Sequence, residues 1–240
     1  MIRLGVNIDH VATLRNARGE THPSPIFAAK QAMKFGANSV TIHLREDRRH
    51  IKDKDLFLIS KNKKINLNLE IAGTKKMIRI ALKYKPKFVC IVPEKRKEIT
   101  TEGGLKLSKN TYKLKNFIKK LNNCKIRTSL FINPKLSDVK LAKLIGAHCV
   151  ELHTGRISNK IKNGSKYQKE YKIIKNSAKY AKKLNLEVHA GHGLDYKTTK
   201  ILTKIKEIEE FNIGHFIIGE AVFFGISKVI KDFKKIIKNK

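Results

Sequence analysis

Short segments rich in β-branched and other apolar residues alternate with segments of helical periodicity along the whole chain. Strict alternation of this kind implies parallel strands that are joined by helical crossovers. The expected strands are 4–8, 39–43, 65–70, 88–92, 127–132, 149–152, 186–189 and 211–213. For the last strand 215–218 is the alternative, but 211–213 leaves Gly214 and His215 at the same strand end as the other polar clusters.

Eight strand–helix units in 240 residues are the size of a (β/α)₈ barrel, the TIM-barrel fold, in a single domain spanning residues 1–240. The alternative is an open doubly wound sheet, which would need fewer strands, and no G-x-G-x-x-G follows the first strand. Ser24 and Asp195 are expected to cap helices. Arg15 and Arg18 are expected in a loop after the first strand, and the polar segment 156–168 is interpreted as a loop.

The segment at about 93–107 is long for a loop within a compact domain. Long loops that carry no regular structure are usually lids or binding loops. We therefore expect a lid-like loop between the fourth strand and the helix that follows it.

The chain is strongly basic, with 53 lysines and arginines against 20 acidic residues and a net charge of +33. Such a charge favours either nucleic-acid binding or a compositional bias that acts on every exposed position. The lysines are scattered over nearly every expected helix, tryptophan is absent and aromatic residues are few. This pattern argues against a specific nucleic-acid partner, although non-specific adhesion to polyanions at low salt is expected.

The sequence contains no apolar run of the length that a membrane helix needs, and its first residues lack the apolar core of a signal peptide. Cys90, Cys124 and Cys149 have no metal-ligand spacing, and the first and last lie inside apolar runs. We therefore expect a protein of the reducing cytoplasm, with no membrane partner and with Cys90 and Cys149 buried.

Polar side chains follow most of the expected strands. The segment Thr41–His50, TIHLREDRRH, opens as a strand and ends in imidazoles, arginines and carboxylates. Alone it could be an exposed charged loop, but a parallel barrel brings the carboxyl ends of all its strands to one face, where barrel enzymes hold their active sites. The side chains expected there are Asn7, Asp9, His10, His43, Arg45, His50, Glu70, Glu151, His153, His192 and His215.

Glu70 lies between apolar neighbours, so burial would raise its pKa and make it a candidate acid or base unless an arginine or histidine pairs with it.

Gly191-His192-Gly193 and Gly214-His215 follow the last two strands, where barrels commonly bind phosphate, although both could be ordinary tight turns. With Arg18 and Arg45, two anionic groups could be held. A metal-dependent hydrolase is the alternative, but no H-x-H pair ends the first strand.

Several motifs together closely resemble the pyridoxine 5′-phosphate synthase family: GVNIDHVATLRNARG, TIHLREDRRHI, NLE, VPEKRKEITTEGGL, ELHTG, AGHGL and NIGH. They occur in the family order from residue 5 to about residue 220. The resemblance implies a cytoplasmic (β/α)₈ barrel that assembles as a homo-octamer and uses neither a cofactor nor a metal. It also implies condensation of 1-deoxy-D-xylulose 5-phosphate with 3-amino-2-oxopropyl phosphate to pyridoxine 5′-phosphate, phosphate and water.

The resemblance assigns roles where the motifs match. His43 and Glu70 correspond to proton acceptors, His192 to the proton donor and Glu151 to the transition-state stabiliser. The residues that would hold the amino-ketone phosphate are Asn7, Gly193, Gly214 and His215. The residues that would hold the deoxyxylulose phosphate are Asp9, His10, Arg18, Arg45, His50 and Thr100. The chain departs from the family pattern at His189, where a smaller polar residue is usual, and in its high lysine content.

Overall fold

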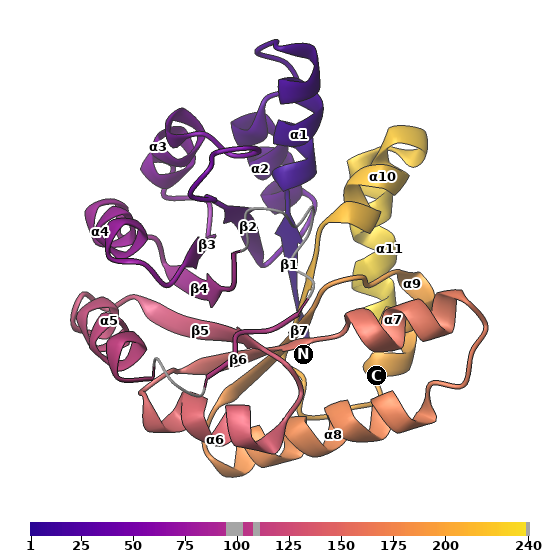
Figure 1. Ribbon diagram of the computed structural model, residues 1–240. Helices are drawn as coiled ribbons and strands as arrows, with labels where there is room; N and C mark the ends of the chain where they lie inside the picture. The colour runs from indigo at the N-terminus through magenta and orange to yellow at the C-terminus, as the bar shows by residue number, and fades with distance from the viewer. Residues whose placement is uncertain (95–102, 108–110, 239–240) are drawn as a thin grey trace.

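The computed structural model describes residues 1–94, 103–107 and 111–238, and its strands close into a parallel barrel in the order β1-β2-β3-β4-β5-β6-β7-β8 (Figure 1). The strands are β1 (Arg3–Asn7), β2 (Ser39–His43), β3 (Leu67–Ala72), β4 (Phe88–Val92), β5 (Arg127–Ile132), β6 (Cys149–His153), β7 (Glu187–Gly191) and β8 (Glu210–Ile213). The predicted (β/α)₈ barrel is confirmed and the open sheet is wrong, because β1 pairs in parallel with both β2 and β8.

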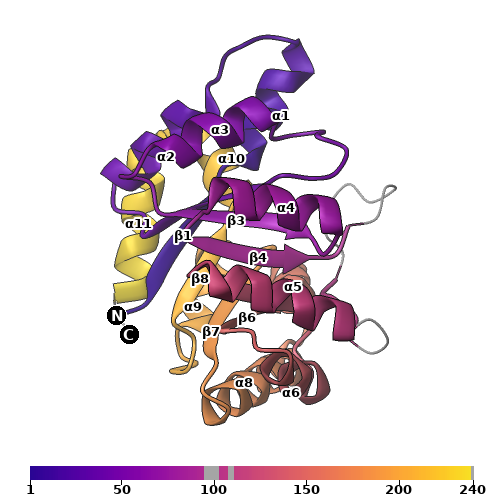
Figure 2. The ribbon, with the colours of Figure 1, turned by 90° about the vertical axis from the view of Figure 1, so that its left-hand side faces the viewer.

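Helices cover the outside of the barrel (Figures 1 and 2). They are α1 (Asp9–Arg18), α2 (Pro25–Lys34), α3 (Asp53–Lys61), α4 (Lys75–Tyr84), α5 (Thr111–Asn123), α6 (Leu136–Leu144), α7 (Gly155–Lys162), α8 (Gln168–Lys183), α9 (Tyr196–Leu202), α10 (His215–Phe224) and α11 (Ile226–Lys238). No helix in the described part of the chain is long and apolar enough to span a membrane.

The strands place apolar side chains outward and polar ones inward. In β3, Leu69 and Ile71 join the apolar core beneath the helices, while Asn68 donates a hydrogen bond of 3.1 Å to Thr41 inside the barrel. Successive strand residues point to opposite faces, so Glu70 shares the inward face with Asn68. Polar side chains therefore line much of the barrel interior, together with the apolar Val92 and Phe131, and the interior opens at the carboxyl ends of the strands.

Two segments expected as loops form helices instead. Arg15 and Arg18 belong to α1, which buries Val11, Ala12 and Arg15 and ends at Gly19 with a φ of 67°. The guanidinium of Arg15 donates to both carboxylate oxygens of Asp55, at 2.6 and 2.9 Å. A buried, bidentate ion pair of this kind ties α1 to α3, so Arg15 has a structural role.

The second correction is α7, which begins at Gly155 and covers the first part of the segment 156–168 that is interpreted as a loop. Ile157 and Ile161 lie one helical turn apart and are both buried, which is a helical signal within a polar stretch. The two helix caps predicted at Ser24 and Asp195 are confirmed: Ser24 accepts from a backbone N–H in the first turn of α2, and Asp195 does so in α9.

The long segment after β4 returns to the barrel at β5. Gly104 donates its backbone N–H to the Asn133 side chain at 3.1 Å, and Leu105 donates its own to the Phe131 carbonyl at 2.8 Å. Leu105 also forms a parallel bridge with Ile132. The middle of the predicted lid, including Thr100, lies outside the described residues.

Candidate active site

A cavity of about 340 Å³ opens at the carboxyl ends of the barrel strands. Most of the predicted site residues line it: Asn7, Asp9, His10, His43, Arg45, His50, Glu70, Glu151, His192, Gly193, Gly214 and His215. Arg18 does not line this cavity; it is exposed at the far end of α1. The barrel closure therefore brings together residues that are separated by up to two hundred positions in sequence.

His43, at the end of β2, is held by two carboxylates. Its backbone N–H donates to Asp9 Oδ1 at 2.8 Å, and its ring Nε2 lies 2.8 Å from Glu94 Oε1. Asp9 also accepts from the Asn7 side chain at 2.9 Å. Burial raises the pKa of Asp9 even though His43 and these hydrogen bonds favour its charged form.

Two further carboxyl groups lie inside the barrel. Burial, followed by the nearby Glu151 and Asp9, raises the pKa of Glu70 well above its ordinary value. Burial also raises the pKa of Glu151 to about 7, although His189 and a hydrogen bond of 2.7 Å from Asn212 oppose the rise. The predicted rise for Glu70 is confirmed, and no ion pair to Glu70 is found within the described ranges. The cavity thus holds carboxyl groups that keep a proton near neutral pH.

Several imidazoles also line the cavity wall. The rings of His10 and His215 lie 5.0 Å apart. Burial, together with the nearby His215 and His50, lowers the pKa of His10 to about 4. Burial and the guanidinium of Arg45 also lower the pKa of His50, whose Nδ1 lies 2.8 Å from the Thr13 hydroxyl. His10 and His50 are therefore neutral at pH 7, and the positive charge on this wall comes from Arg45.

His192 follows β7 in a left-handed backbone conformation with a φ of 82°. The Thr154 hydroxyl lies 2.6 Å from the His192 carbonyl, to which it donates, and the His192 ring stacks on His153 at 4.8 Å. A side chain at Gly155 would lie 3.0 Å from the His192 ring and closer still to His153. The turn that begins α7 therefore shapes the wall on which His192 lies.

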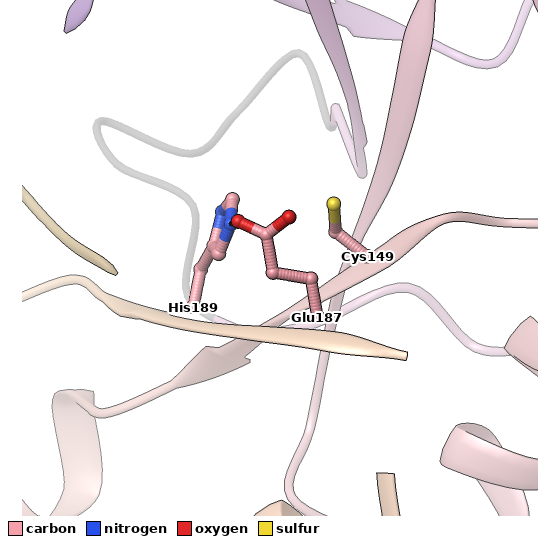
Figure 3. Close-up of side chains that lie close together, drawn as sticks. All are labelled: Cys149, Glu187 and His189. Atoms are coloured by element: carbon pink, nitrogen blue, oxygen red, sulfur yellow. Dashed lines mark hydrogen bonds and ion pairs between the residues drawn. The ribbon is translucent and has the colours of Figure 1, made fainter. Parts of the chain in front are cut away.

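Two groups of side chains in the described part of the chain could hold a metal ion. Asp9, His43 and Glu70 have ligand atoms within 4.8 Å of one another in the cavity. Cys149, Glu187 and His189 form the second group (Figure 3).

The second group lies at the amino-terminal ends of β6 and β7, away from the cavity. Its Glu187 already pairs with the guanidinium of Arg3 and with that of Arg127, the latter at 2.9 Å. Two guanidinium charges compete with a metal ion for the same carboxylate, so this group is better described as a partly buried ion network.

The chain is similar to known proteins. The family model described as "Pyridoxal phosphate biosynthesis protein PdxJ" matches residues 4–239. The chain belongs to this family. A relative from Pelagibacter ubique, named pyridoxine 5′-phosphate synthase, is 63% identical over 236 residues and covers 98% of this chain and 99% of its own. A relative of the same name from Zymomonas mobilis is 51% identical and covers 96% of this chain and 89% of its own.

Solved structures with similar folds are much more distant in sequence. Phosphoribosyl anthranilate isomerase from Thermotoga maritima aligns with a TM-score of 0.64 at 13% identity, covering both chains in full. 3-Hexulose-6-phosphate synthase aligns with a TM-score of 0.64 at 14% identity, covering 98% of this chain and 100% of its own. At this identity the likeness shows that the PdxJ-family chain shares the barrel fold, and it carries no information about its reaction.

Several residues of the PdxJ-family chain that line the cavity, or contact a residue that does, were not among the predicted site residues. Lys162 lines the cavity at the end of α7 and lowers the pKa of His192, after burial, which has the larger effect. Glu94 reaches His43, and Asn212 reaches Glu151. The spacing of the isoleucines in α7 could have revealed the helix that carries Lys162, whereas no local pattern marks Glu94 or Asn212.

The raised pKa of Glu151 predicts a pH-dependent stability. The carboxyl releases its proton near pH 4.5 in the unfolded chain but near pH 7 in the folded one, so the folded state binds more protons between these values. The free energy of unfolding therefore falls as the pH rises through this window. We expect Glu151→Gln to remove this part of the fall and to be more stable than wild type by about 3 kcal/mol at pH 8, with little difference at pH 4.5.

Urea denaturation of both proteins at the two pH values measures the effect. The exposed Glu20→Gln is the control for the loss of one carboxylate. A wild-type pH dependence in Glu151→Gln would show that Glu151 titrates normally in the folded protein.

Proposed function

We propose that this chain is a pyridoxine 5′-phosphate synthase that condenses 1-deoxy-D-xylulose 5-phosphate with 3-amino-2-oxopropyl phosphate. The products are pyridoxine 5′-phosphate, inorganic phosphate and water. The observation that carries the proposal is the meeting of His43, Glu70, Glu151 and His192 around one cavity in a member of this family. We expect the enzyme to act in the cytoplasm and to need neither a cofactor nor a metal.

The reaction requires several proton transfers. An amine condenses with a ketone and loses water, and ring closure then requires loss of water and phosphate, each step needing an acid or base in place. Glu70 holds its proton in the empty cavity because burial and two neighbouring carboxylates disfavour its charge. An ammonium group on the incoming amino ketone would favour that charge, so substrate binding would convert Glu70 into a base. His43 would act as the second proton acceptor, and Glu151 would stabilise the developing positive charge.

His192 would return protons to the leaving group. Its neighbour Lys162 carries a positive charge into the cavity wall. A phosphate ester beside Lys162 would offset that charge, which otherwise disfavours the protonated imidazole. His192 would therefore be protonated once the phosphorylated substrate is in place.

Two neighbouring phosphate subsites are proposed in the cavity. Gly193, Gly214, His215 and Asn7 would hold the amino-ketone phosphate. Helix α10 begins at His215, and the backbone N–H groups of a helix's first turn favour an anion. Side chains at Gly193 or Gly214 would crowd Ser158 and Asn7, at 3.1 and 2.9 Å.

The deoxyxylulose phosphate would be held by Arg45, His50, His10 and Asp9. Thr100 is a further predicted contributor, whereas Arg18, also predicted, lies outside this cavity in the single chain. The buried Nδ1 of His10 has no hydrogen-bond partner among the described residues, as expected of a group that awaits a ligand. Closure of the loop at about 93–107 over this wall would exclude water from the imine.

A direct assay tests the reaction. Purified protein is incubated with both phosphorylated substrates, and pyridoxine 5′-phosphate and released phosphate are measured, with each substrate omitted in turn. Product that requires both substrates supports the proposal. Absence of product from folded protein would show that the cavity serves another pair of substrates.

The grouping of Asp9, His43 and Glu70 supports a metal-dependent hydrolase as a second candidate function. Chelation during the assay separates the two candidate functions, because the proposed synthase should retain full activity and a metal hydrolase should lose its activity.

The charge of +33 motivates a polyanion-binding alternative. Affinity for nucleic acid that collapses at about 200 mM salt would assign that binding to non-specific charge.

We propose that the enzyme is a homo-octamer in which the end of α10 contributes an interface. Val222, Phe223 and Phe224 are 72%, 81% and 56% exposed in the single chain. Adjacent large apolar side chains exposed to this extent usually mark an interaction surface. The α10 patch, meaning these three residues, lies on the other side of the barrel from α6 (Figures 1 and 2).

Introducing a charge into the α10 patch should weaken the assembly. We expect Phe223→Asp to give a smaller particle by light scattering, because a buried, unpaired carboxylate at an interface costs several kcal/mol. Leu144→Asp, an equally drastic change at a 67% exposed residue of α6, is the matched control and should leave the mass unchanged. An unchanged mass for Phe223→Asp would exclude this face from the interface.

A further inference from the structure

Glu94 follows β4 and is almost fully buried against His43. The exposed fractions of the two side chains are 9% for Glu94 and 7% for His43, and Glu94 Oε1 lies 2.8 Å from His43 Nε2. None of the roles assigned above includes Glu94. A carboxylate on one nitrogen of a buried imidazole usually determines which nitrogen carries the proton.

The hydrogen bond to the second carboxylate oxygen of Glu94 indicates that the Glu94 carboxyl group is ionised. Glu94 Oε2 accepts the backbone N–H of Glu46 at 3.0 Å, and this donor favours an ionised carboxylate. The hydrogen bonds from His43 and Glu46 lower the pKa of Glu94 although burial alone would raise it. An ionised carboxylate only accepts, so His43 donates from Nε2–H, and in the neutral imidazole the lone pair then lies on Nδ1.

Asp9, the other carboxylate that contacts His43, has a different role. Asp9 Oδ1 accepts the backbone N–H of His43, which places the main chain and leaves the ring orientation to Glu94. Glu70 and Arg45 also face this part of the cavity, but no hydrogen bond from either to the His43 ring is found in the described part of the chain.

We propose that Glu94 is a positioning residue that holds His43 in the tautomer with the proton on Nε2, so that Nδ1 can accept a proton in the reaction. The proposal rests on the proposed synthase function, in which His43 is a proton acceptor. Glu94 does not itself exchange a proton with substrate in this scheme. It acts on the reaction through His43, as the carboxylate of a serine-protease triad acts through its histidine.

Glu94→Gln gives the sharpest test because the backbone N–H of Glu46 can only donate. The amide oxygen of the new glutamine must accept it, so the amide NH₂ faces His43 and donates to Nε2. We therefore expect the tautomer of His43 to reverse, with the proton on Nδ1. The corresponding change in a protease triad lowers kcat by about 10⁴-fold, and outer-shell partners more generally contribute about 10–100-fold.

Two measurements follow. Solid-state NMR of protein labelled with ¹⁵N-histidine, without substrates, reports the tautomer of His43, whose signals are assigned by comparison with His43→Asn. Steady-state kinetics should show kcat lowered by about 10²–10⁴-fold with KM changed little. Glu46→Gln is the matched control, since the Glu46 side chain contacts Thr74 at 3.0 Å and only its backbone contacts Glu94.

A wild-type tautomer in Glu94→Gln, or a kcat within about twofold of wild type, overturns the proposal. A reversed tautomer with lowered kcat and an unaffected Glu46→Gln supports it. If the proposed function is wrong, the wild-type protein forms no product in the assay with both substrates. The tautomer of His43 is measured without substrates, so its result does not depend on that assay.

Discussion

Glu70→Gln is expected to lower turnover by about 10²–10⁴-fold while leaving the barrel folded. Glu70 sits on β3 within the cavity, and burial together with Glu151 and Asp9 raises its pKa well above the ordinary value. The amide has nearly the same shape as the protonated carboxyl but can neither give up nor accept a proton at neutral pH. Because the wild-type group is already neutral in the empty cavity, the substitution should cost little stability.

The measurements are kcat and KM from pyridoxine 5′-phosphate formation, with thermal unfolding to confirm the fold. Glu20→Gln makes the same chemical change at an exposed position outside the cavity and should retain full activity. Near-wild-type turnover in Glu70→Gln would remove Glu70 from the mechanism. A loss of kcat without a change in melting temperature would support its role as an acid or base.

Gly104→Ala is expected to destabilise the junction between the long loop and β5. A Cβ at this position would lie 2.2 Å from the backbone nitrogen of Asn133 and 2.2 Å from the carbonyl carbon of Ile132. Both atoms belong to the backbone that continues β5, so they cannot rotate away as a side chain would. We expect a cost of about 1–3 kcal/mol, as for overpacking in a protein interior.

The neighbouring glycine supplies the matched control. A Cβ at Gly103 would approach the described residues no closer than 3.9 Å, at the side chain of Asn133. Gly103→Ala should therefore change stability by less than about 0.5 kcal/mol. Hydrogen exchange at the Leu105 amide, which bonds to the Phe131 carbonyl at 2.8 Å, should accelerate only in Gly104→Ala. Equal effects of the two variants would show that the loss of glycine flexibility, and not the contact with β5, determines the outcome.

Much of the site could be predicted because strand periodicity is a local property. Alternating residues point to opposite faces, so the residue types in 39–43 and 65–70 already indicate that His43 and Glu70 point inward. Parallel strands then bring their carboxyl ends to one face, which places His192 and Gly214 near both. The predicted last strand at 211–213 is also confirmed, because β8 ends just before Gly214.

The segment 156–168, which includes most of α7, is rich in polar residues and therefore indicates a loop, and the sequence near Arg15 and Arg18 gives no clear sign of α1. The stability of these helices depends on partners that are distant in the chain: Arg15 pairs with Asp55, forty positions away. Helix formation in a polar segment is decided largely by such tertiary contacts rather than by intrinsic propensity. Arg18 lies outside the cavity because α1 continues away from the strand end instead of turning back over it.

The sequence by itself determined the alternation of strands and helices, and with it the barrel and the residues that gather at its open end. Only the tertiary structure decided which of these residues contact one another. Glu94 reaches His43 across fifty-one positions, and Asn212 reaches Glu151 across sixty-one. Contacts of this kind depend on where separate strands lie once the barrel has closed, and no periodicity within either strand records that distance. The protonation states of Glu70 and Glu151 follow from the same closure, because burial and neighbouring carboxylates arise only in the folded barrel.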